Sequence, residues 1–210
     1  PTPSLVENVI RSVFPLLAGQ ALESRRLSRG VLEQIFALSS IKYRLVASNL
    51  TMILLQQENL RSTEGVLAFI ESCLKSGTEK ETLEGVQVWS CLSHGCLQAL
   101  FPRGGGSNQA LKLCDRFMNA LSPAFGSESS LVVCAVATAW QNVIQTRLLG
   151  LARMKEPLRR FKELLVPLDF IWSRSTFHFL DPAFHGLQLC WAELFSRIAH
   201  VSERYRFPCW

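Results

Sequence analysis

The chain has 210 residues, of which 48% are hydrophobic and 19% charged, with a formal net charge of +5 at pH 7. A chain of this length buries a sizeable core, and its apolar content excludes a disordered protein. The positive excess is smaller than that of a dedicated nucleic-acid-binding tail. We therefore expect one globular domain over residues 1–210.

The cysteines indicate a reducing compartment. The sequence contains an odd number of them, at Cys73, Cys91, Cys96, Cys114, Cys134, Cys190 and Cys209. Most lie among apolar residues in helical patterns, which favours buried reduced thiols and hence the cytosol or nucleus. Because the chain starts at Pro1 and opens with no basic-then-apolar signal segment, we expect an excised C-terminal fragment of a larger protein.

Hydrophobic residues recur at three- and four-residue spacing, which predicts helices. In the first half of the chain we expect helices over residues 4–22, 27–38, 41–57, 63–75 and 78–100. The first should kink at Pro15 and bury a face made by Leu5, Val9, Val13, Leu16 and Leu17. A turn at Glu58 and Asn59 should end the third. Gly77 suits the end of the fourth helix, and Thr78 with Glu81 fits a capping box for the fifth.

The second half should contain an amphipathic helix over residues 107–121, a central helix over 127–153, and two more helices over 157–168 and from Pro182 onward. No residue from Ser129 to Thr146 carries a charge, and apolar residues cover every side of that helix. We expect it to be buried on all sides. A membrane span is disfavoured because Gln141 and Asn142 interrupt the apolar run. The last helix should place its large apolar residues inward: Phe184, Leu187, Trp191, Leu194, Phe195 and Ile198.

The fold class that follows is all-α, with nine to ten helices, since no segment alternates with period two for long enough to indicate a strand. Helix pairs begin near residues 4, 41, 78 and 127, at intervals of roughly 40 residues, which is typical of stacked helical repeats. We expect a short helical-repeat solenoid or an irregular multi-helix bundle.

A proline lies within an early apolar helix, in Val13-Phe14-Pro15-Leu16-Leu17-Ala18. This segment is similar to the first helix of a HEAT repeat, and the layout of the whole chain resembles HEAT and armadillo-like α-solenoids. The aspartate and arginine positions that follow in that family are not clearly matched, so the resemblance is divergent. In the overall pattern of its sequence and in its last residues, Tyr205–Trp210, the chain also resembles vertebrate armadillo-like factors of meiotic DNA break formation. Those resemblances imply a nuclear or cytoplasmic scaffold for other proteins.

Neither a cofactor nor a metal is expected. Gly104–Gly106 lacks the lysine that closes a phosphate-binding loop. Two groups contain potential metal ligands, namely Cys91, His94 and Cys96, and His178, Asp181, His185 and Cys190. Neither has the spacing of a tetrahedral zinc site, and Asp181 before Pro182 is better explained as a helix cap. No catalytic motif is present, so we expect that the protein is not an enzyme.

The densest charge in the chain is basic and extends from Arg147 to Lys162. It is either a solvated helix face or a patch for acidic partners or nucleic-acid phosphates. Interleaved aromatic residues for base stacking are missing. We therefore expect a non-catalytic scaffold that docks a partner peptide or helix, with nucleic-acid contact through the basic edge as the alternative. The candidate partner-binding residues are Arg153, Lys155, Arg159, Arg160, Lys162, Phe207 and Trp210.

Overall fold

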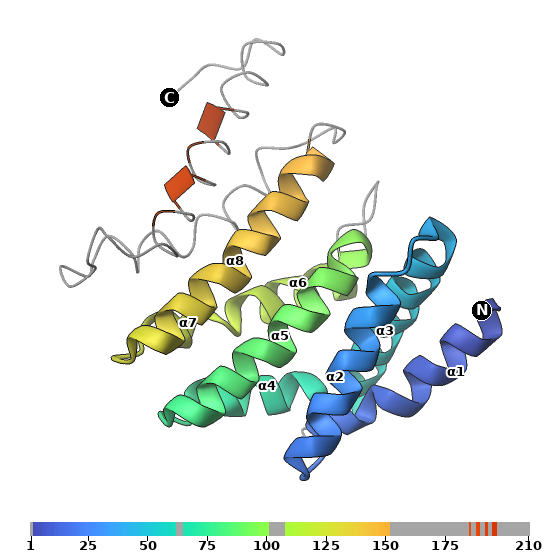
Figure 1. The fold of residues 1–210 in the computed structure, drawn as a ribbon, viewed down its shortest axis with the longest axis horizontal. Helices are drawn as coiled ribbons and strands as arrows, with labels where there is room; N and C mark the ends of the chain where they lie inside the picture. Colours follow the sequence, from blue (N-terminus) through green and yellow to red (C-terminus); the bar gives the residue numbers. More distant parts are fainter. Residues whose placement is uncertain are drawn as a thin grey trace. The chain divides into compact units, whose positions relative to one another are not determined.

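The fold is known from a computed structural model. It describes residues 2–61, 65–100 and 108–151, together with six positions of the last predicted helix, residues 185, 188, 189, 192, 195 and 196. The chain divides into two compact units, Pro1–Ala124 and Phe125–Trp210. The described residues contain helices and no strand (Figure 1), which confirms the all-α class for this part of the chain.

The elements of the first unit are α1 (Pro3–Val13), the 3-10 turn η1 (Pro15–Ala18), α2 (Leu22–Phe36), α3 (Ile41–Arg61), α4 (Val66–Lys75), α5 (Glu79–Leu100) and α6 (Asn108–Asn119). A single helical turn, α7 (Ser122–Phe125), spans the division, and α8 (Ser130–Leu151) belongs to the second unit. Seven helices of ten residues or more are thus described, fewer than the nine to ten expected. The predicted helix over residues 157–168 lies outside the described residues, and a repeat arrangement stays a prediction.

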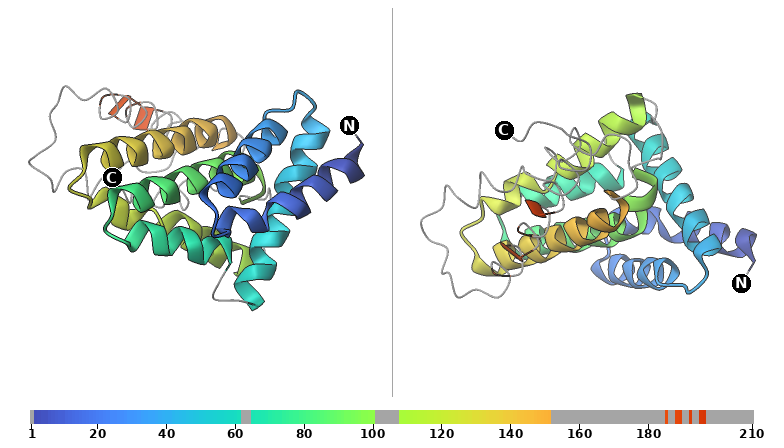
Figure 2. Two further views of the ribbon diagram at one scale, coloured as in Figure 1. Left: turned by 60° about the horizontal axis from the view of Figure 1, so that its bottom comes forward. Right: turned by 90° about the horizontal axis from the view of Figure 1, so that it is seen from above.

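Helix α5 is the centre of the first unit. It packs mainly against α3 and α4 and also touches α2 and α6, while α1 packs against α3 (Figures 1 and 2). Because α5 has neighbours on several sides, its apolar residues are buried around much of the helix. These residues are Val86, Val88, Trp89, Cys91 and Leu92.

Trp89 joins α6 to α5. Its ring stacks on Phe117 with 5.1 Å between the ring centroids and 10° between the planes. The indole Nε1 also donates a 2.7 Å hydrogen bond to the Phe117 carbonyl oxygen. A buried indole needs such an acceptor for its N–H. Trp89 therefore buries its ring against Phe117 and pairs its N–H at the same junction of α5 and α6.

The turn between α4 and α5 follows the sequence prediction closely. Gly77 has a φ of +75°, a conformation that glycine adopts without strain. α5 begins at Glu79, so Thr78 occupies the capping position. The Thr78 hydroxyl donates a 2.9 Å hydrogen bond to the Glu81 carboxylate. The helix start is confirmed, although the bond shown here joins the two side chains directly.

Helices α4 and α5 approach so closely at Gly85 that there is no room for a side chain. A Cβ atom there would lie 2.8 Å from Cys73 Cβ and 3.2 Å from Leu74 Cγ. We predict that Gly85→Ala separates the helices and lowers the free energy of unfolding by about 1–3 kcal/mol, although alanine favours helix. Urea denaturation measures the change.

Gly30 in α2 provides the matched control, because a Cβ atom there would meet nothing within 4 Å. Gly30→Ala should raise the free energy of unfolding by roughly 0.5–1 kcal/mol. Stabilisation by both substitutions would show that the close approach at Gly85 is absent in solution.

The predicted buried face of the first helix is wrong in part. α1 ends at Val13, and Pro15 starts η1, so the proline ends the α-helix rather than bending a longer one. The fully buried residues are Val6, Ile10, Phe14 and Leu17, whereas Leu5 and Leu16 are 53% and 45% exposed. Because the segment has apolar residues on two overlapping stripes, sequence spacing alone did not select the stripe that packs.

The boundary between α3 and α4 also differs from expectation. α3 continues to Arg61, so the turn predicted at Glu58 and Asn59 is helical. α4 starts at Val66, after the extended residue Gly65, rather than at Thr63. The buried residues of α4 are Val66, Leu67, Ile70 and Leu74.

In the second unit, α8 is buried around most of its circumference but not all of it. Val132, Val136 and Val143 are fully buried. Trp140 is also buried, with its ring edge-on to Phe125 at 6.1 Å between centroids. The expectation of burial on all sides is wrong, since Leu131, Thr138 and Asn142 are exposed along one strip. A polar residue every one to two turns is enough to mark the outer strip of a mostly apolar helix.

Two further observations concern apolar helices. Phe195, expected on the inner face of the last helix, is 50% exposed, so that prediction is wrong at this position. The other residues of the predicted face lie outside the described residues. No helix within the described ranges is long and apolar enough to cross a bilayer.

Candidate functional site

The partner-binding residues predicted from sequence, Arg153, Lys155, Arg159, Arg160, Lys162, Phe207 and Trp210, lie outside the described residues and remain predictions. Of the two predicted Cys/His groups, only Cys91 and His185 have described side chains. Cys91 is buried in α5, and His185 is exposed. Within the described part of the chain, no three His, Cys, Asp or Glu residues come together in a way that could hold a metal ion.

A buried carboxylate surrounded by arginines joins α2 to α5. Glu84 Oε1 lies 3.4 Å from Arg25 Nε and 3.7 Å from Arg29 Nη1. The side chains of Glu84, Arg25 and Arg29 are 9%, 15% and 17% exposed. Sequence analysis missed this cluster because 59 residues separate Arg25 from Glu84. No local pattern shows that two helices so distant in the chain will meet.

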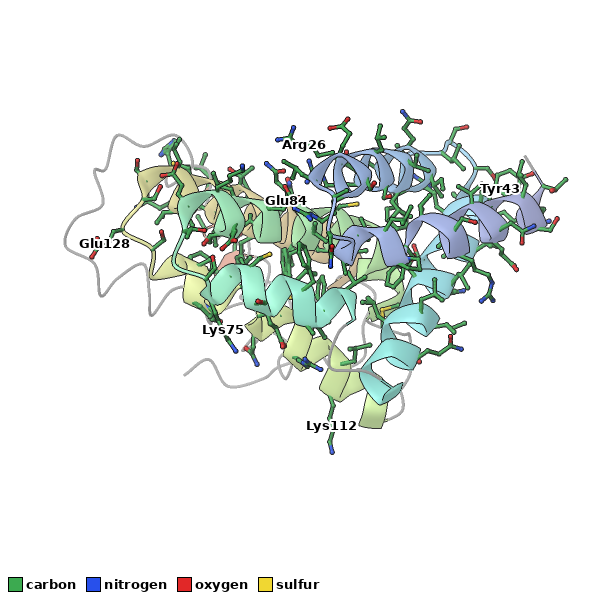
Figure 3. All side chains as sticks on the ribbon, turned by 90° about the horizontal axis from the view of Figure 1, so that it is seen from below. Arg26, Tyr43, Lys75, Glu84, Lys112 and Glu128 are labelled. Carbon is green, nitrogen blue, oxygen red and sulfur yellow. The ribbon has the colours of Figure 1, made fainter. Side chains whose placement is uncertain are left out.

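The contacts of Arg25 indicate a structural role for the cluster. Its Nη1 donates hydrogen bonds of 2.7 Å and 2.9 Å to the carbonyl oxygens of Gly19 and Gln20. Its guanidinium also lies over the Phe69 ring of α4, 5.2 Å from the centroid. Arg25 therefore holds together the loop before α2, α4 and α5. Figure 3 shows the labelled Glu84 at the meeting of α5 and α2.

A second ion pair joins α4 to α6 nearer the surface. Arg116 donates two hydrogen bonds of 2.7 Å to the two carboxylate oxygens of Glu71. These bonds hold the pKa of the Glu71 carboxyl below its ordinary value and raise the pKa of Arg116. The geometry is a paired fork that fixes orientation. Like the Glu84 cluster, it connects helices.

The thiols of Cys91, which is buried, and Cys73, which is half-buried, are poor nucleophiles. Burial raises the pKa of Cys73 to about 11 and that of Cys91 to about 12. Cys91 Sγ lies 3.8 Å from the Arg29 carbonyl oxygen, between α5 and α2. Since the thiolate is the nucleophilic form, these two cysteines fit the core-thiol interpretation of the sequence.

We predict that Cys73 and Cys91 resist alkylation by iodoacetamide in the native protein at pH 8, because the raised pKa of each thiol leaves almost no thiolate. Burial also blocks access to Cys91. The unfolded chain in urea should be labelled at both positions. Peptide mass spectrometry reads each site separately. Equal labelling rates in native and unfolded protein would contradict the buried placement.

The remaining feature is an exposed strip on α3, here called the α3 face. It begins with the consecutive residues Ile41 and Lys42 and continues at intervals of three or four residues. All of its residues are exposed: Ile41, Lys42, Leu45, Asn49, Ile53 and Gln57. The opposite side of the helix is buried through Ala47, Leu50, Thr51 and Leu55. Although α3 packs on α1, α2 and α5, Ile41, Leu45 and Ile53 remain 64%, 43% and 45% exposed.

The sequence contained one indication of the α3 face, an excess of apolar residues, but their spacing did not show which of them are exposed. Residues 41–57 read as strongly apolar because the helix has more large hydrophobic residues than one packed face can use. The excess, Ile41, Leu45 and Ile53, lies on the outside. Single exposed hydrophobic residues are ordinary. Three on one face of one helix, with polar residues between them, are more typical of a contact surface.

The α3 face is also one-sided in charge. No acidic residue occurs between Glu33 and Glu58, whereas Lys42 and Arg44 lie in the first turn of α3. Backbone N–H groups at a helix start add positive potential there. The face therefore combines apolar side chains with a positive end.

Comparison with known proteins does not identify a family for this chain. No family model matches the chain, and neither a curated protein nor a solved structure is similar enough to match it. The class of protein is set by the described residues alone. They form helices that charged clusters join, and α3 carries three of the large apolar residues that stay exposed.

Proposed function

We propose that this chain is a non-catalytic interaction module that docks a helical segment of another protein on the α3 face. The observation that carries the proposal is the exposure of Ile41, Leu45 and Ile53 on one side of a helix whose other side is core. Docking of an amphipathic helix by apolar anchors three and four residues apart is a recurring mode of recognition.

The chemistry of the described polar groups supports a non-catalytic role. Glu84 is engaged by two arginines, Glu71 by one, and the thiols of Cys73 and Cys91 have raised pKa values. Each of these groups has a structural use. A general acid or base would need to face a substrate at hydrogen-bond distance.

The setting we propose is a larger intracellular assembly. Cys73 and Cys91 form no disulfide bond, which supports a reducing compartment. The resemblance to armadillo-like factors of meiotic DNA break formation makes a nuclear assembly the first place to seek the partner. The basic residues Arg153–Lys162 remain a predicted second contact, to an acidic segment or, in the alternative function, to nucleic acid.

Site-specific photo-crosslinking tests the proposed function. A photoreactive phenylalanine at position 53 should crosslink to a discrete protein in a nuclear extract, and Leu45→Gln should reduce that product. The matched control position is Leu16, which has the same 45% exposure as Ile53 but lies on η1. Crosslinking that is equal at positions 53 and 16, or absent at 53, would overturn the proposal.

A further inference from the structure

We infer that the occupant of the α3 face is an acidic amphipathic helix whose carboxylates lie toward the N-terminal end of α3. This inference rests on the proposed function and adds the chemistry and direction of the partner. The apolar part of the argument comes from Leu45 and Ile53, which lie eight residues apart on one face with Asn49 between them. A helix laid along α3 would place its own apolar ridge beside these side chains.

Charge determines which helix fits. Lys42 is exposed on the α3 face, Arg44 lies in the same first turn and is half-buried, and no carboxylate occurs from Ile41 to Gln57. The other end of the face carries the neutral Gln57. Acidic residues at one end of the partner would therefore meet Lys42 and the positive end of the helix dipole. The asymmetry of charge along α3 gives the complex a direction.

A second copy of the chain fits the face less well. Two α3 faces would bring together only positive and neutral side chains, with no opposite charge between Ile41 and Gln57 of either copy. Three exposed apolar residues per copy also provide little of the area that a stable dimer interface requires. A partner that supplies carboxylates would pair with the positive charge of the α3 face. In a complex of two copies, that charge would have no opposite charge to pair with.

The test uses two synthetic helical peptides that share one leucine stripe, at i, i+3, i+4 and i+7. One carries glutamates at one end of the stripe, and the other carries lysines there. The full chain should bind the acidic peptide at least roughly tenfold more tightly at low salt, with the difference shrinking as salt rises. Fluorescence anisotropy measures both affinities, and analytical ultracentrifugation follows self-association.

Matched variants locate the contact. The double substitution Leu45→Gln with Ile53→Gln should weaken binding of the acidic peptide roughly tenfold or more, and Lys42→Glu should slow its association. Leu16→Gln and Lys75→Glu are the controls, both at exposed positions on other elements. Figure 3 shows Lys75 far across the view from Tyr43, which marks the start of α3. Thermal melting should show that every variant keeps the fold.

The outcomes separate this inference from the function on which it rests. Equal affinity for the two peptides, equal loss in the Leu16→Gln control, self-association through Leu45, or tighter binding of a short DNA duplex would each overturn the acidic-helix assignment. If crosslinks still formed at position 53, the docking function would stand and only the partner's chemistry would be wrong. If the acidic peptide showed no preferential binding and no crosslink formed at position 53, both the acidic-helix assignment and the docking function would be wrong.

Discussion

Replacing Val136 by Asp should unfold the second unit. Val136 is fully buried in α8, and an aspartate there would place a carboxylate in apolar surroundings without a hydrogen-bond or charge partner. We expect the loss in free energy of unfolding to exceed about 4 kcal/mol, the range reserved for buried unpaired charges and lost networks. Circular dichroism and size-exclusion chromatography should show lost helix or an aggregated product.

Thr138→Asp is the control for this experiment. Thr138 lies two residues further along the same helix, on its exposed strip. It introduces the same charge and the same helix propensity, so it should change stability by no more than about 0.5 kcal/mol. A soluble Val136→Asp protein that unfolds cooperatively near the normal temperature would disprove the burial of α8 at this position.

Replacing Glu84 by Ala should destabilise the first unit by about 3 kcal/mol or more, because it leaves buried positive charge without a counterion. Arg25 would retain the carbonyl oxygens of Gly19 and Gln20. Arg29 would lose its nearest buried carboxylate, and its Nη1 is already buried without a hydrogen-bond partner. Urea denaturation followed by tryptophan fluorescence and circular dichroism measures the change.

Glu33→Ala tests whether any loss of negative charge near Arg29 would have the same effect. Glu33 Oε1 lies 3.9 Å from Arg29 Nε, but the Glu33 side chain is 58% exposed. Exposed pairs of this kind contribute little, so the substitution should cost under about 0.5 kcal/mol. A similar decrease in the free energy of unfolding for Glu84→Ala and Glu33→Ala would mean that the cluster of Glu84, Arg25 and Arg29 is exposed to solvent.

Sequence reasoning predicted helix existence well and helix faces less well. The ends of α5, the glycine stop at Gly77 and the buried stripe of α4 followed from capping and spacing. These features are local, so neighbouring residues determine them. Faces were harder where apolar residues exceed what one face can bury, as in α1, α3 and α8. Only packing against other helices selects among the stripes that such a segment offers.

The candidate site was hardest to predict from the sequence. Sequence analysis favoured a basic edge, because clustered charges are visible in a linear pattern, and that edge lies outside the described residues. The α3 face is visible only once Ala47, Leu50 and Leu55 are known to occupy the inner side of the helix. The Glu84 cluster likewise depends on two helices that meet across 59 residues of chain.

The link between Arg25 and Glu84 bears on how the first unit folds. A piece of the chain that stopped after α4 would retain both arginines and Phe69 but lack the carboxylate that α5 supplies. Trp89 and Phe117 extend the same dependence to α6. Stacked repeats that touch only their neighbours can unravel from one end. In the first unit, the contact between Arg25 and Glu84 joins two helices that are not consecutive in the chain. We therefore expect α2, α4, α5 and α6 to fold and unfold in one cooperative transition.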